Sequence, residues 1–401
     1  MSVVNSVVME AGGIESWPVP TGGIVQRDPD GTLTGLLQEQ AQQFVLDQRL
    51  PDAVDHMAAA LAAASDHYLT EGITSCQEAG IGTGLVGRSP RQLAAFQQAR
   101  DDGRLKVRVT AMVAMESLHR LDGHVDDPEG IGLDLGLRTG LGDDRLRVGA
   151  VKIFADGSLI GRTAAMVDDF ADAPGNRGYF QMDEGDLREA VIGAHRAGWQ
   201  VAVHAIGDRA VSTVLDCYEE ALALAPRANH RHRIEHCGIC RPEDVARIAA
   251  LGVIPVPQGR FVNEIGDGMA AALGPERTTW CYRQRSFLDA GVVLPASSDR
   301  PVVQGAPLLG IADMVNQRTG SGAAFNPAEA LTPLEALRAY TLGSAVASFA
   351  EDRKGSITPG KLADLAVLDR DLTAIDPEGI AETRVLATYV GGEAAWERTS
   401  S

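Results

Sequence analysis

The chain has 401 residues, of which 45% are hydrophobic and 22% charged; this is the composition of an ordinary globular protein with room for one barrel domain and a small extra domain. Its net charge of −18 argues against a nucleic-acid partner, and no run of about 18 apolar residues suggests a membrane span. Five irregularly spaced cysteines, and an N-terminus without a basic start and a sustained apolar core, predict a cytoplasmic protein with no signal peptide.

Strand-like and helix-like segments alternate along most of the chain. The first 50 residues are rich in Gly and Pro and predict loops, a hairpin and a short helix. From about residue 52 the hydrophobic period switches repeatedly between helical and strand values, which is typical of βα units around a parallel sheet. Seven strands are predicted, over Gly72–Glu78, Leu105–Met115, a run starting at Leu146, Gln200–Ile206, His232–His236, Val253–Val256 and Val292–Ala296.

Helices are predicted between and after these strands, and the C-terminal tail differs in character. The helices cover Ala53–Glu71, Gln92–Asp102, Glu184–Ala197, Arg209–Leu224, Glu243–Leu251, Arg283–Ala290 and Pro333 to about Phe349. A long loop is predicted over Ser297–Asn326. The tail shows strand–turn–strand patterns without helices, so we expect a barrel domain over 1–350 and strands of a small β-domain over 351–401.

The run LRVGAVKIFADG, residues 146–157, predicts a buried strand that ends in an Asp-Gly turn. It carries one lysine, Lys152, near its end. A buried ammonium is costly, so either its charged head reaches water or its pKa is lowered and it takes part in chemistry. The sequence around Lys152 leaves both readings open.

Three further predicted strands end in residues of metal-ligand type. They are VAVHAIGD with His204, HRIEHC with His236 and VVLPASSD with Asp299. The carboxyl ends of parallel barrel strands meet at one face, so we expect these side chains and Lys152 to lie together. Imidazoles and carboxylates suit Zn, Fe, Mn or Co, and a neutral lysine can react with carbon dioxide to give an anionic carbamate. Beside a metal-bound water, Asp299 would hold a proton and pass it to a leaving amine.

Taken together, these segments resemble the amidohydrolase superfamily, and within it amidohydrolase family 3, the branch of N-substituted formamide deformylase. The resemblance is carried by NSVVMEAGGI, GITSCQEAG, VKIFADGSLIGRTAAM, VAVHAIGDRAV, HRIEHC, SSDRPV and GSITPGKLADLAVLDRD, in the family's order from Asn5 to Asp371. It implies an α/β fold, a (β/α)8 TIM-type barrel, followed by the C-terminal part of a small β-domain.

The resemblance also implies roles for individual residues. Lys152 is the bridging metal ligand, carboxylated at its amine; His204 and His236 hold one metal; Asp299 is a ligand to the other metal and the proton shuttle. The cofactor implied is a divalent metal, zinc first, as one or two ions. The substrate pocket is expected to be shaped by Asp156, Ser158, Arg162, Tyr179 and Arg300.

One part of the family pattern has no counterpart in these 401 residues. The family opens with a first barrel strand that ends in His-x-His, and we expect this strand to be missing here, which agrees with the count of seven strands where a closed barrel has eight. The literal His230-Arg-His232 precedes the His236 strand and is interpreted as a chance or loop pair. His195 falls late in a predicted helix and is expected at the surface.

The sequence therefore predicts a metal-dependent hydrolase that acts on a non-peptide C–N bond, an amide or N-substituted formamide, through metal-bound hydroxide. Its partner is a small-molecule substrate, with no nucleic acid and no membrane; a homodimer is an open alternative. Two rival functions stay open. One is deamination or lactone opening at the same site, and the other is a truncated inactive or partner-dependent subunit.

Overall fold

The fold is built on a parallel sheet. The computed structural model describes residues 1–48, 52–124 and 130–399. Six strands pair in the order β11-β10-β9-β8-β5-β4, all in parallel. Their bounds are β4 Ser75–Ile81, β5 Arg108–Ala114, β8 Leu146–Phe154, β9 Val201–Ala205, β10 Arg233–His236 and β11 Ile254–Val256.

The sheet is strongly curled. Arg233 on β10 donates from Nη1 to Oε1 of Gln77 on β4 over 2.6 Å, although three strands separate β10 from β4. In a flat sheet these two strands would lie roughly 19 Å apart. The prediction of an α/β, barrel-type fold is therefore confirmed: the parallel sheet forms a half-barrel, and its concave face holds polar side chains.

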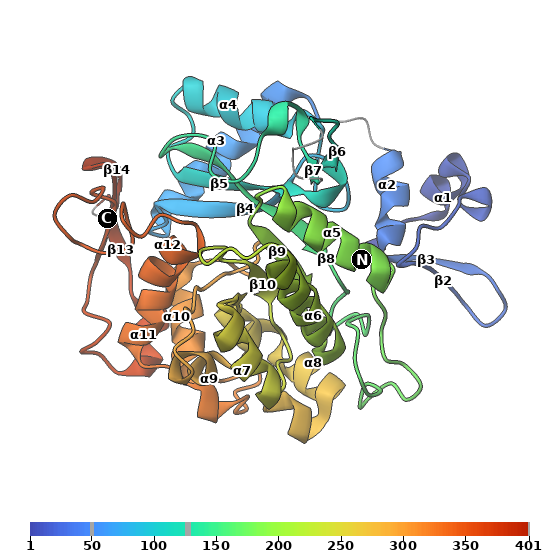
Figure 1. The fold of residues 1–401 in the computed structure, drawn as a ribbon. Coiled ribbons are helices and arrows are strands. Elements are labelled where there is room, and N and C mark those ends of the chain that lie inside the picture. The colour runs from blue at the N-terminus through green and yellow to red at the C-terminus, as the bar shows by residue number, and fades with distance from the viewer. Residues whose placement is uncertain (49–51, 125–129, 400–401) are drawn as a thin grey trace.

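Helices cover the convex side of the sheet (Figure 1). Their bounds are α3 Val54–Thr70, α4 Gln92–Asp101, α5 Glu184–Arg196, α6 Asp208–Leu224, α7 Pro242–Leu251, α8 Gly259–Thr278, α9 Gln284–Asp289, α10 Pro307–Asn316, α11 Pro333–Arg338 and α12 Ser344–Ala347. Within the described ranges, none of these helices combines the length and apolar character needed to cross a membrane.

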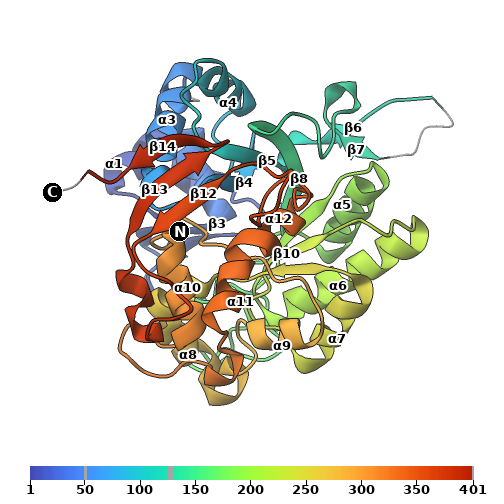
Figure 2. The same cartoon turned by 90° about the vertical axis from the view of Figure 1, so that its left-hand side faces the viewer.

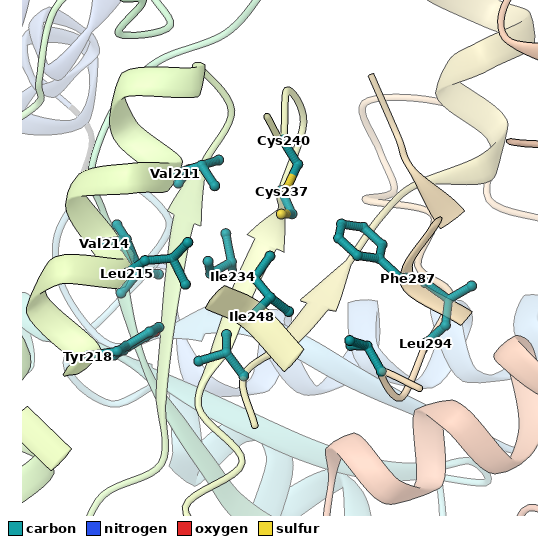
Figure 3. Packing of buried hydrophobic residues seen from close by; sticks show 14 of the residues in the cluster. Val211, Val214, Leu215, Tyr218, Ile234, Cys237, Cys240, Ile248, Phe287 and Leu294 are labelled. Atoms are coloured by element: carbon teal, nitrogen blue, oxygen red, sulfur yellow. The ribbon is translucent and has the colours of Figure 1, made fainter. Parts of the chain in front are cut away.

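The main core lies between the sheet and these helices. Figure 3 shows α6 contributing Val211 and Leu215, which face Ile234 of β10, with Ile248 of α7 beside them. Strands β8 and β9 give alternate residues to this layer, which on β8 include Val151 and Ile153. The opposite faces of the same strands therefore line the concave side.

Two predictions near the end of the barrel differ from the structure. Val292–Ala296 forms no ladder; its strand-like course reaches β11 only through one parallel bridge between Gln258 and Ser297. Pro295 lacks the N–H group that a regular ladder needs. The loop predicted over 297–326 contains α10, which begins at Pro307, a favourable first helical position.

Helix α8 had no predicted counterpart. Its sequence contains Gly266, Gly268 and the pair Gly274–Pro275, all unfavourable for helices, and Gly274 kinks it at φ +73°. Burial of residues such as Phe261 and Met269 in a second apolar cluster stabilises this helix despite its composition.

Two small antiparallel sheets flank the half-barrel on opposite sides (Figure 1). The N-terminal sheet has the order β1-β3-β2, and the C-terminal sheet has the order β12-β13-β14. The bounds are β1 Ser2–Val3, β2 Gly23–Arg27, β3 Leu33–Glu39, β12 Leu365–Leu368, β13 Val385–Val390 and β14 Glu393–Glu397, with short helices α1 Ser6–Gly12 and α2 Gln43–Asp47. The predicted small β-structure at the C-terminus is confirmed; of the first 50 residues, 49 and 50 lie outside the described part.

A buried ion pair fastens the C-terminal sheet to the half-barrel, whose β4 and β5 lie behind it in Figure 2. Arg108 of β5 donates from Nε and Nη2 to both carboxylate oxygens of Asp364, over 2.7 and 2.9 Å. Their side chains are 9% and 4% exposed. Bidentate pairs of this kind are rigid, and removing one partner leaves a buried charge uncompensated.

We expect Asp364→Ala to lower the free energy of unfolding by about 3 kcal/mol, because it leaves the Arg108 guanidinium buried without its carboxylate. Urea denaturation followed by circular dichroism measures this. The matched control is Asp66→Ala, which breaks the exposed pair with Lys106 and is expected to cost less than about 1 kcal/mol. Equal losses in the two variants would contradict a fastening role for Asp364.

Candidate active site

Lys152 lies on the concave face of β8. Its neighbours Val151 and Ile153 pack against the helices, so strand alternation turns Lys152 the other way. The side chain is 4% exposed, and Nζ lies 4.5 Å from the centroid of the Phe154 ring. Burial lowers the pKa of Lys152 to about 8, while Glu235 and Asp299 act in the opposite sense. The buried reading of Lys152 is therefore the one that the structure supports.

His204 and His236 lie at the ends of the two strands that follow. Their ring centroids are 4.5 Å apart, with the rings at 71°. His204 contacts the carbonyl of Gly157 through Nε2 at 2.9 Å, and His236 contacts Oε1 of Gln258 through Nδ1 at 2.7 Å. Burial lowers the pKa of both imidazoles, which favours the neutral form that a metal requires.

An ion pair lies on the same concave face. Arg233 donates from Nε and Nη2 to the two carboxylate oxygens of Glu235, over 2.7 and 2.9 Å, and both side chains are buried. Among the charged groups around Lys152, the carboxylate of Glu235 has the largest effect on its pKa. The pair therefore supplies a negative charge near the lysine and is itself held by Gln77.

Asp299 follows the strand-like segment 292–297. Its φ is +55°, a conformation that is rare for residues other than Gly and Asn and recurs at functional sites. Its carboxylate raises the pKa of Lys152 and of His236, so it lies within electrostatic reach of both. Among the residues that the structure describes, no three His, Cys, Asp or Glu side chains stand close enough to hold a metal by themselves.

Asp156 has three backbone partners. Its Oδ1 accepts from the N–H of Ile206, and its Oδ2 accepts from those of Ala165 and Gly207, at 2.8–3.0 Å. Oδ1 also lies 3.5 Å from Nε2 of His204. Burial raises the pKa of Asp156 to about 7. Through these hydrogen bonds the Asp156 carboxyl joins the loops that follow β8 and β9.

The loop after β8 holds the other expected pocket residues in different settings. Ser158 accepts the N–H of Gly161 through Oγ, at 3.1 Å. Arg162 pairs with Asp172 and also donates to the carbonyl of Leu159. Tyr179 has a buried hydroxyl for which the described residues provide no hydrogen-bond partner.

Arg300 lies apart from this loop. Its Nη2 donates to Oε1 of Glu71 over 2.8 Å, and its guanidinium stacks 5.3 Å from the Tyr68 ring centroid. It lines a cavity of about 520 Å³ together with residues of α3 and of the segment 301–304. Within the described part of the chain, none of these contacts involves Lys152, His204 or His236. Arg300 is linked to the candidate centre through its sequence neighbour Asp299.

The literal His-x-His pair lies at the opposite end of β10 from His236. His230 accepts the N–H of His232 at Nδ1, and His232 accepts the N–H of Val201 at Nδ1, at 2.9 and 3.0 Å. His232 Nε2 lies 2.8 Å from Nδ1 of His195. The prediction that His195 lies at the surface is wrong, because its imidazole joins this buried network and is 3% exposed. His195 follows Val191 by four residues and so shares the buried side of α5, a spacing that could have predicted its burial.

Two further residues of the site, Gln258 and Glu235, were not predicted. Gln258 follows β11 by two residues, so the strand-end rule that selected His236 applies to it equally. Glu235 immediately precedes His236, but no feature of the sequence distinguishes it from an acidic residue exposed to solvent.

The sequence matches the model of the amidohydrolase family over residues 1–395. It is 30% identical over 401 residues to YtcJ of Bacillus subtilis, which is named as an amidohydrolase, with 99% of this chain and 72% of that protein covered. It is 29% identical over 419 residues to N-substituted formamide deformylase of Arthrobacter pascens, again covering 99% and 72%. The structure resembles that of an uncharacterized metal-dependent hydrolase from Pyrococcus horikoshii, with a TM-score of 0.69 and 26% identity over 94% of this chain and 70% of the other.

Acid is expected to destabilise the network of His195, His230 and His232. Burial lowers the pKa of all three below 6.5, so the unfolded chain binds more protons than the folded chain does below that pH. Their contribution to the free energy of unfolding is therefore complete above pH 6.5. It is lost as the pH falls, by up to about 1.4 kcal/mol per imidazole and pH unit. Urea midpoints between pH 7.5 and 5.5 measure this slope.

The slope should be smaller in His195→Gln than in the wild type, while His56→Gln, which changes an exposed imidazole, should keep the full slope. The same slope in all three proteins would contradict the role assigned to the network.

Proposed function

Because this chain belongs to the amidohydrolase family and is a hydrolase acting on carbon–nitrogen bonds, we propose that it hydrolyses a non-peptide amide or N-substituted formamide with a divalent metal. The residues proposed for the reaction are Lys152, His204, His236 and Asp299. One observation carries the proposal: two neutral, buried imidazoles and a buried lysine converge from adjacent parallel strands.

These residues fit a divalent metal by their chemistry. His204 and His236 offer adjacent neutral imidazoles, and Gln258 fixes the orientation of the second ring through its Nδ1. Lys152 becomes an anionic oxygen donor once carboxylated, which supplies the further ligand that His, Cys, Asp and Glu alone do not provide here. When bound, the metal, with Zn as the first ion to test, would polarise the carbonyl and activate water.

Carboxylation of Lys152 requires the neutral amine. With a pKa of about 8, a substantial fraction of Lys152 is unprotonated near neutral pH, in contrast to an exposed lysine. The Nζ lone pair then forms an N–C bond to carbon dioxide, and one proton is released. The carbamate is an anion, so the guanidinium of Arg233 favours it, whereas the carboxylates of Glu235 and Asp299 oppose it until a bound metal cation would offset their charge.

Asp299 is proposed as the residue that moves the proton. Its carboxylate lies within electrostatic reach of Lys152 and His236, at the mouth of the half-barrel. It would take a proton as water attacks the carbonyl carbon and deliver it to the nitrogen as the C–N bond breaks, so that the amine leaves neutral.

Removing the lysine tests the ligand set. We expect Lys152→Ala to lose bound metal, measured by elemental analysis of the purified protein, and to lose kcat/KM by about 10³-fold or more. Lys106→Ala changes an exposed lysine and serves as the control. Full metal content in Lys152→Ala would contradict a ligand role for Lys152.

A substrate panel tests the reaction class. We expect hydrolysis of N-substituted formamides or simple amides, measured as amine release, and no turnover of amino-pyrimidines or lactones. Chelation should abolish the activity and Zn should restore it. Turnover of lactones or amino-pyrimidines alone would favour the rival reactions, and inactivity of the metal-loaded protein towards every compound would favour the inactive-subunit reading.

A further inference from the structure

The stretch of residues 177–181 runs beside the loop that follows β8. The N–H of Tyr179 donates to the carbonyl of Thr163 over 3.2 Å, and that of Gln181 donates to the carbonyl of Ala155 over 2.8 Å. Ala155 in turn donates its N–H to the carbonyl of His204 over 3.0 Å. The stretch is therefore tied to the backbone of a proposed metal ligand.

The side chains of residues 179–181 have different surroundings. Phe180 packs against the main core, and the guanidinium of Arg209 lies 5.0 Å from its ring centroid. Tyr179 and Gln181 flank Phe180 in sequence and lie outside that core cluster. The N-terminal sheet adjoins this region: a side-chain carbon at Gly22 would lie only 2.5 Å from the carbonyl oxygen of Gln181.

Two side chains of this stretch keep unsatisfied polar atoms. Gln181 is 4% exposed, and within the described part of the chain neither Oε1 nor Nε2 has a hydrogen-bond partner. The buried hydroxyl of Tyr179 is in the same condition. Buried polar groups are normally paired, because leaving them unpaired costs their full desolvation. Two such groups two residues apart indicate a surface made for a ligand.

Glu39 connects the stretch 177–181 with the candidate centre. It ends β3 at a φ of +47°, which is unfavourable for a residue with a side chain. Its Oε1 accepts from Oγ1 of Thr163 over 2.7 Å and lies 3.0 Å from where a side-chain carbon of Gly157 would stand. The carbonyl of Gly157 contacts His204. Thr163 links the two residues, because its carbonyl accepts the N–H of Tyr179 and its hydroxyl donates to Glu39. Burial raises the pKa of Tyr179, and the Glu39 charge raises it further.

We propose that Glu39, Tyr179 and Gln181 form a polar subsite, beside the candidate centre, that binds the nitrogen-side substituent of the substrate, and that this substituent carries a hydroxyl or amine. The inference rests on the proposed function, because the acyl side of a formamide is only a hydrogen and all distinguishing chemistry lies on its nitrogen side. The carboxylate of Glu39 and Oε1 of Gln181 are acceptors, so they require a donor on the ligand.

The test compares two probes of similar shape, N-(2-hydroxyethyl)formamide and N-propylformamide. We expect the wild type to prefer the hydroxylated probe in kcat/KM by about tenfold or more, because the alkyl probe leaves buried polar atoms unpaired. In Tyr179→Phe and Gln181→Met the preference should fall to within about twofold, through KM more than kcat.

Tyr340→Phe is the matched control. Its hydroxyl is also buried and unpaired within the described chain, but it packs against Gly310 on α10, away from Glu39 and Tyr179. This variant should keep the wild-type preference. If either subsite variant fails to fold by circular dichroism, Glu39→Gln, which retains an acceptor for Thr163, serves in its place and should weaken the preference.

Calorimetric binding of the two probes separates the subsite from the reaction. A binding preference for the hydroxylated probe that the variants lose, without any turnover, would overturn the proposed function and support the subsite. Formamide hydrolysis with equal preference in the wild type and all variants would overturn the subsite and leave the function standing. Loss of the preference in Tyr340→Phe would also overturn the proposed subsite.

Discussion

Burial of charge on the concave face of the parallel sheet is the constraint on which the site depends. Lys152 is nearly inaccessible, and a lone ammonium there would be strongly disfavoured. The carboxylate of Glu235 reduces this penalty, and Arg233 holds both oxygens of Glu235 while reaching Gln77 on the far strand. The contacts that close the sheet upon itself therefore also place the carboxylate that partly offsets the effect of burial on the lysine pKa.

The strand ends need a second layer of organisation, which comes from hydrogen bonds to backbone. Asp156 joins three N–H groups from the loops after β8 and β9, and its carboxyl also approaches His204. Gln258 orients His236 and is itself held by the carbonyl of Val256. Parallel strands deliver side chains to one edge, but these contacts decide which imidazole nitrogen faces the centre.

The N-terminal sheet brings a distant part of the chain to the same region. Glu39 and Thr163 are separated by 124 residues in sequence yet share a hydrogen bond beside Gly157. A barrel of βα units supplies chemistry from its strand ends, whereas discrimination between substrates falls to loops and added elements. The proposed subsite accordingly assigns substrate selectivity to β3 and the stretch 177–181.

The sequence by itself determined the order of the βα units and the strand-end positions of Lys152, His204 and His236, because hydrophobic periodicity and turn residues are local signals. Its resemblance to amidohydrolases named the family. Only the tertiary structure decided that α8 forms despite its glycines, that α10 interrupts a predicted loop, and that His195 is buried. It also decided that Asp156 is taken up by backbone N–H groups and that Glu39 lies near Tyr179. These features depend on contacts between residues far apart in the chain, and on the cost of burying polar groups, which no local pattern records.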